Sequence, residues 1–95
     1  MDEGGSKSKV RDVIFSQHAL LKIEILRRHS MIIKESFIRD AVTNPDKIIS
    51  GYKGRYIAQK KLDEEHILRV IYERRKEDVL IITFYPARRE RYEKS

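Results

Sequence analysis

The hydrophobic pattern of the chain changes at Pro45, and this change limits the folds that the sequence can adopt. Before Pro45, apolar residues recur at the three- and four-residue spacing of amphipathic helices. After it, short runs rich in β-branched and aromatic residues alternate with charged or glycine-containing turns, a pattern typical of strands. The sequence therefore predicts an α+β fold, with two N-terminal helices packed on one face of a mostly antiparallel sheet of four to five strands.

Two helices are expected before Pro45. The first should cover residues 17–28 after a short strand over 13–15, because Ser16 is a good N-cap for the turn that follows it. The second should cover residues 34–42 and end at Asn44-Pro45, since the residue before a proline avoids the helical conformation. No good N-cap precedes this second helix.

Four strands are expected after Pro45, over residues 47–49, 56–59, 66–72 and 79–85. We expect Pro86 to end the last of them. Both faces of the last two strands carry apolar residues, so these strands should be central in the sheet. Residues 1–10 are interpreted as a flexible leader, and residues 11–95 as a single domain.

The composition favours a polyanionic partner. The net charge is +6 and the pI is about 9.7, which attracts phosphate-bearing molecules such as RNA. Without cysteine, the chain has neither a disulfide framework nor a thiolate nucleophile, and we expect no metal and no cofactor. No apolar run approaches the length of about 18 residues that spans a membrane. With no secretory signal in the sequence, the cytoplasm is the expected location.

Arg69 is the exceptional residue of the predicted strands, because it lies among apolar neighbours. It must form a salt bridge with a carboxylate, or its guanidinium must face a phosphate in a groove across the sheet. Lys60 and Lys61 end the preceding strand and point to opposite faces. Only one of them can share a groove with Arg69, and the sequence does not indicate which one.

The chain carries no common catalytic motif. Its arginine, lysine, tyrosine and histidine side chains suit metal-independent RNA cleavage, in which a ribose 2′-hydroxyl attacks its own phosphate. They suit plain phosphate binding equally well. His18, in the first turn of the first helix, is either a neutral base or a packed or capping histidine. Tyr85 and Tyr92 lie in a basic segment, where an aromatic ring can stack on a base.

Two sets of short motifs resemble known families. Residues 68–72, a charged turn, residues 79–83 and the Arg88–Tyr92 segment resemble the C-terminal half of RelE-superfamily toxins, particularly the BrnT-like branch. These are small basic ribonucleases of prokaryotic toxin–antitoxin pairs. Residues 16–19, Asn44-Pro45 and the Thr-Phe-Tyr-Pro ending at Pro86 resemble an uncharacterised prokaryotic domain family with a His-Ala helix motif.

The resemblance implies a RelE/BrnT-like fold and a set of site residues. It implies catalytic roles for Arg69, Tyr92 and His18, for Arg88 or Arg89 after the last strand, and for Lys60 or Lys61 in the strand before that of Arg69. We take Arg88 and Lys61 as the catalytic members of these two pairs. Nucleic-acid contacts are expected from Lys22, Lys60, Arg89, Arg91 and Tyr85, of which Arg91 and Tyr85 are chosen for their place in the basic C-terminal segment. Lys22 departs from the second family, where an arginine is usual.

The function implied is a metal-independent ribonuclease that acts on messenger RNA, free or on the ribosome, and is neutralised by an antitoxin protein. The alternative is a non-catalytic module that binds nucleic acid or another protein. The oligomeric state is not indicated by the sequence.

Overall fold

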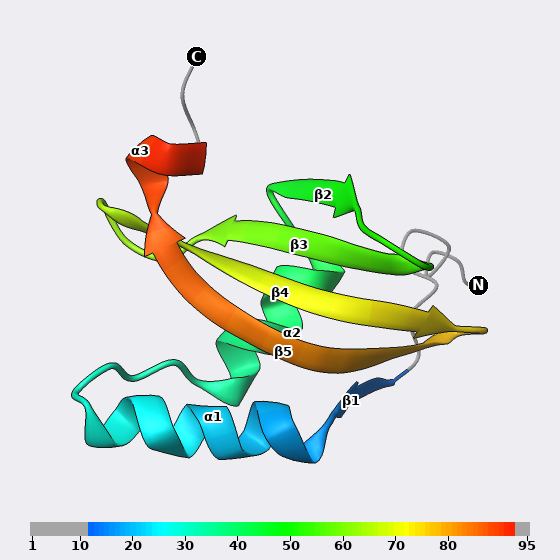
Figure 1. Cartoon of the computed structure of the whole chain (residues 1–95), viewed down its shortest axis with the longest axis horizontal. Helices are drawn as coiled ribbons and strands as arrows, with labels where there is room; N and C mark the ends of the chain where they lie inside the picture. The colour runs from blue at the N-terminus through cyan, green and yellow to red at the C-terminus, as the bar shows by residue number, and fades with distance from the viewer. Residues whose placement is uncertain (1–11, 93–95) are drawn as a thin grey trace, which may run out of the picture.

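The structure is a computed structural model that describes residues 12–92 (Figure 1). The expected leader over residues 1–10 lies outside the described residues. Eight elements follow one another along the chain: β1 (Val13–Phe15), α1 (Gln17–Arg28), α2 (Glu35–Thr43), β2 (Lys47–Ser50), β3 (Arg55–Lys61), β4 (His66–Arg75), β5 (Asp78–Arg88) and α3 (Arg89–Tyr92).

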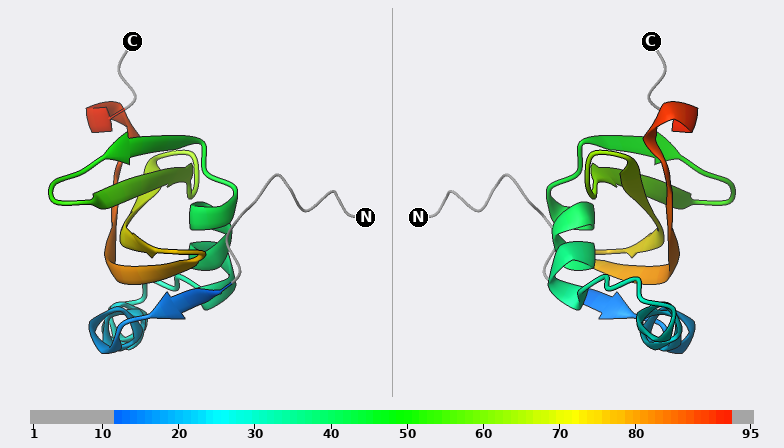
Figure 2. Two further views of the ribbon diagram at one scale, coloured as in Figure 1. Left: turned by 90° about the vertical axis from the view of Figure 1, so that its right-hand side faces the viewer. Right: turned by 90° about the vertical axis from the view of Figure 1, so that its left-hand side faces the viewer.

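The strands form one five-stranded sheet in the order β1-β5-β4-β3-β2. β1 is parallel to β5, and the other neighbouring strands are antiparallel. α2 lies behind the sheet in Figure 1 and packs against β3 and β4, while α1 runs beneath β5 and packs against β5 and β1. Figure 2 shows how strongly the sheet curls around the core. The predicted α+β fold, with a mostly antiparallel sheet, is confirmed.

The core lies between the helices and the sheet. Its fully buried members come from both helices and from the strands, and include Ala19, Ile38, Ala58, Val70 and Phe84. Burying a large apolar side chain contributes roughly 1.5–3 kcal/mol. The helices therefore cover one face of the sheet and leave a mixed polar and apolar surface on the other.

The start of α1 is tied to the sheet by one serine. The Ser16 Oγ accepts a hydrogen bond from the Ala19 N–H at 3.0 Å, which confirms the predicted N-cap. The same hydroxyl donates to the Ile82 carbonyl oxygen at 2.9 Å. α2 begins after Lys34, which makes no side-chain capping bond, and ends before Pro45, as expected.

The predicted end of the last strand is wrong. β5 continues through Pro86 as far as Arg88, and Pro86 pairs with Leu68 of β4. β1 pairs with β5 only from Val79 to Ile81, so β5 has a neighbour on one side alone at Pro86. A proline is tolerated at such a free edge, because its missing N–H need not serve a second strand.

Ser16→Ala should lower the free energy of unfolding by about 1–2 kcal/mol, because it removes both the helix cap and the bond to β5. Urea denaturation followed by circular dichroism measures the change. Ser50→Ala is the matched control, since Ser50 is exposed in β2 and forms no side-chain hydrogen bond within residues 12–92. Equal denaturation midpoints for the two variants would contradict the role of Ser16.

Candidate polyanion-binding face of the sheet

The face of the sheet opposite α1 and α2, here called the open face, is organised in rows by the strand register. Residues paired directly across neighbouring strands point to the same side of a sheet. The Arg69 row runs across four strands as Lys47, Gln59, Arg69 and Tyr85. The next row is mainly apolar and consists of Ile49, Ile57, Ile71 and Thr83.

Arg69 is 8% exposed and is held by neutral groups. Its Nε–H donates to the Tyr85 hydroxyl at 2.9 Å, and its Nη1 donates to the Gln59 Oε1 at 2.6 Å. The Tyr92 ring covers the guanidinium, with its centroid 4.1 Å from the Arg69 Cζ. Within residues 12–92 no carboxylate forms a salt bridge with Arg69, so the salt-bridge alternative is not realised among them.

The buried polar groups of this row have more donors than acceptors. A guanidinium has five N–H groups and stays protonated, and two of those of Arg69 find acceptors within residues 12–92. Gln59 is 3% exposed, and its amide oxygen is committed to Arg69 because arginine can only donate. Its NH₂ group has no acceptor among the described residues. Buried donors without acceptors are costly, and a bound anion would satisfy them.

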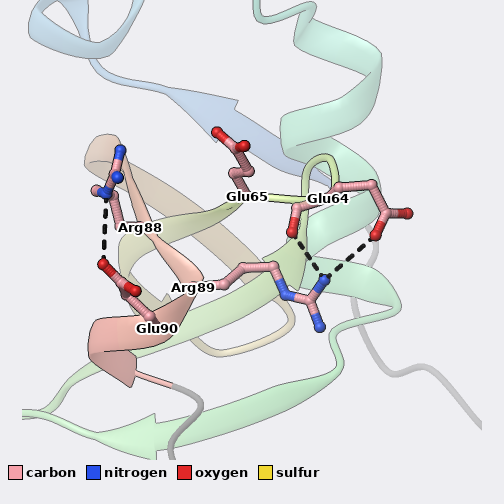
Figure 3. A pocket seen from close by; sticks show the side chains of 5 residues that line it. All are labelled: Glu64, Glu65, Arg88, Arg89 and Glu90. Carbon is pink, nitrogen blue, oxygen red and sulfur yellow. Dashed lines mark hydrogen bonds and ion pairs between the residues drawn. The ribbon is translucent and has the colours of Figure 1, made fainter.

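α3 holds Tyr92 over Arg69, and Arg89 anchors α3. The Arg89 N–H donates to the Glu65 carbonyl oxygen at 2.9 Å, and its Nη1 donates to the Glu64 carbonyl oxygen at 3.0 Å. Figure 3 shows Arg89 directed at Glu64, on the turn between β3 and β4. Arg89 therefore holds α3 and its Tyr92 in position. The resemblance had instead implied that Arg89 contacts nucleic acid.

Arg88 is not directed at Arg69. It is three residues beyond Tyr85 on β5, so the alternation of the strand points it to the other side of the sheet. Its Nε lies 3.7 Å from the Glu90 Oε2 (Figure 3). The pocket at this end of the sheet, about 380 Å³, is lined by three glutamates and two arginines: Glu64, Glu65, Arg88, Arg89 and Glu90. Its acidic lining does not favour an anion.

The register decides between the two lysines at the end of β3. Lys61 is two residues beyond Gln59 and so points to the open face, where its Nζ lies 3.3 Å from the Glu64 Oε2. Lys60 points toward the helices, where its Nζ donates to the Asn44 carbonyl oxygen at 2.8 Å. Lys60 thus caps the C-terminal end of α2 instead of facing the groove.

The two helix residues that the resemblance implied, His18 and Lys22, lie on the side of the sheet away from Arg69 and cannot share a site with it. His18 and Lys22 belong to α1, and the Lys22 Nζ lies 5.8 Å from the ring centre of Phe84 on the helix-facing side. His18 is exposed. The sheet separates both from Arg69, so the implied catalytic set does not come together. Arg91 is exposed on α3.

Two residues of the Arg69 row, Gln59 and Lys47, were missed by the sequence analysis. Neither gives a signal in the sequence, because only the pairing of β2, β3 and β4 brings them level with Arg69. A buried glutamine beside a buried arginine becomes visible only when the register is known.

Comparison with protein-family models, with curated proteins and with solved structures gave no match. Within residues 12–92 there is no helix long and apolar enough to span a membrane. The same residues contain no group of three or more histidine, aspartate or glutamate side chains that could hold a metal ion. The function of the candidate site must therefore be inferred from the arrangement of its own residues.

Gln59→Leu should lower the free energy of unfolding by about 1–3 kcal/mol, because it removes an acceptor from a buried guanidinium. In the Arg69→Met background the same change should cost much less, because no guanidinium is left to satisfy. Urea denaturation of the parent, the two single variants and the double variant gives the coupling. An equal loss in both backgrounds would show that Gln59 supports the fold independently of Arg69.

Proposed function

We propose that the protein binds single-stranded RNA through the open face of the sheet. The carrying observation is the buried Arg69 guanidinium, which has neutral partners and unused donors beside the Gln59 amide. A phosphate supplies both the negative charge and the acceptor oxygens that this pair lacks. Tyr92, already stacked on Arg69, offers a ring on which a base can stack.

The charges around the Arg69 row support a polyanion in preference to a small anion. Lys47 lies at the β2 end of the row, Arg55 lies on the same face of β3, and Arg91 projects from α3. All three are exposed, and none has a carboxylate partner within residues 12–92. A chain of phosphates can contact several of these cations at once. A sheet surface with aromatic rings suits unpaired bases better than a duplex, whose bases are stacked inside.

Arg69→Met should weaken binding of a fluorescently labelled single-stranded RNA about tenfold or more, as expected for the loss of a charge-assisted hydrogen bond. Fluorescence anisotropy at two salt concentrations measures the affinity and its salt dependence. Arg74→Met is the matched control, because it removes the same charge from the opposite face of the same strand. Equal losses for the two variants would point to diffuse charge and overturn the proposed site.

A ribonuclease of the RelE/BrnT-like type is the second candidate. The observation that favours it is that three of the five implied catalytic residues, Arg69, Tyr92 and Lys61, share the open face. Of the implied catalytic residues, those on this face that could move protons are the Tyr92 hydroxyl and the Lys61 ammonium, which is paired with Glu64. His18 is on the other side of the sheet. If this candidate is right, an antitoxin protein should bind the chain, and the RNA substrate can be bound to the ribosome.

The RNA used for binding also tests cleavage. If the second candidate is right, the RNA is cut in the presence of a metal chelator, and 2′-deoxy substitution at the cut position stops the reaction because the nucleophile is missing. Tyr92→Phe should then slow cutting by about a hundredfold or more, the usual contribution of a proton-transfer group. Intact RNA on a denaturing gel, free or ribosome-bound, would leave binding as the function and reject the ribonuclease.

A further inference from the structure

A hollow of about 430 Å³ opens on the same face as Arg69, toward the β2–β3 hairpin. Its size falls in the range of small-molecule pockets. It is lined by residues of the hairpin and of the two strands beside it: Gly51, Tyr52, Lys53, Arg55, Ile57, Ile71 and Glu73. None of these lining residues belongs to the buried core or to the Arg69 row.

The floor of the hollow is apolar. Ile57 and Ile71 are paired directly across β3 and β4, so their side chains lie next to each other on the open face. Both are only partly buried, although a branched aliphatic side chain gains most from complete burial. A planar ring laid on this pair would remove apolar surface from water.

The hairpin fixes an aromatic side chain at the rim. Tyr52 is 80% exposed, which is unusual for so large a side chain in a folded domain. The turn that carries it is tight: the Arg55 N–H donates to the Tyr52 carbonyl oxygen at 3.2 Å, and Lys53 and Gly54 both have positive φ. A Cβ at Gly51 would lie 2.8 Å from the Arg55 carbonyl oxygen, so this close approach requires glycine.

The rim is charged in a way that suits a nucleotide. Lys53 and Arg55 contribute positive charge on the hairpin side. Glu73 is the direct cross-strand partner of Arg55 on β4, and its Oε1 accepts two hydrogen bonds from Arg75 at 3.1 and 2.9 Å. Its Oε2 has no donor among the described residues. A carboxylate oxygen at the edge of an apolar platform can accept from an amino group of a base.

The hollow lies next to the Arg69 row on the same face of the sheet. Ile71 is two residues beyond Arg69 on β4 and points to the same side, about 7 Å further along the strand. Glu73 follows two residues later, at the same spacing. A nucleic-acid strand with one phosphate at Arg69 therefore has its neighbouring base within reach of the hollow.

We infer that this hollow binds one base of the RNA strand, stacked on Ile57 and Ile71 beside Tyr52, and that Glu73 selects bases with an amino group. This inference rests on the proposed function. Adenine, cytosine and guanine each have an amino group that can donate to the Glu73 Oε2. Uracil presents a single N–H between two carbonyl oxygens, which the carboxylate repels. The pocket thus favours adenine and cytosine over uracil.

The experiment measures binding of labelled A₆, C₆ and U₆ ribonucleotides to the parent protein and its variants. A₆ and C₆ should bind more tightly than U₆. Tyr52→Ala should weaken A₆ and C₆ about tenfold, as expected for one lost stacking contact. Glu73→Gln should bring the U₆ affinity close to that of the others, because an amide can both donate and accept.

The control is Ile48→Ala, an exposed position on the helix-facing side of β2. Tyr52 is exposed, so its replacement should leave the far-UV circular dichroism spectrum unchanged. If Tyr52→Ala and Glu73→Gln behave like Ile48→Ala while Arg69→Met still weakens binding, the hollow is not a base pocket and the proposed function stands. If the parent binds none of the three oligonucleotides, the proposed function fails and the base pocket fails with it.

Discussion

The pairing register of β3, β4 and β5 is the constraint on which the other features of the open face depend. It places Gln59, Arg69 and Tyr85 side by side, so that a buried cation receives two neutral acceptors. A slip of one residue would turn every side chain of a strand to the opposite face and bring Arg69 into the core. Burial of Val70 and Phe84 against the helices prevents such a slip, since they occupy the other face at the same level. The apolar core thus fixes the position of the charge.

The sequence was sufficient for the fold and for the central residue of the site. Apolar periodicity predicted both helices, the Ser16 cap marked the start of the first, and the charge within an apolar strand identified Arg69. It was not sufficient for the partners of Arg69. Whether Lys60 or Lys61 faces the groove depends on the register, and Gln59 becomes significant only as the cross-strand neighbour of Arg69. The end of β5 was mispredicted because the effect of Pro86 depends on whether a second strand lies beside it.

The two faces of the sheet differ in the side chains that they carry. One is covered by α1 and α2 and supplies stability, while the other carries buried donors, an aromatic cover and an apolar hollow. This separation explains why His18 cannot act together with Arg69, although short motifs suggested a common site. Because the histidine of the implied catalytic set lies across the sheet and the Lys61 ammonium is paired with Glu64, binding makes fewer demands on this geometry than cleavage does. The α3 turn, anchored by Arg89, keeps Tyr92 in place for either task.

The central claim is that RNA contacts the Arg69 row of the open face. An NMR titration of the isotope-labelled protein with A₆ ribonucleotide tests it most directly, because the Arg69 Nε and the Gln59 side-chain amide give their own signals. The account expects these two signals and the amide of Ile71 to shift together, while the amides of α1 stay unchanged. Shifts concentrated on α1 around Lys22, with the Arg69 Nε signal unmoved, would contradict it.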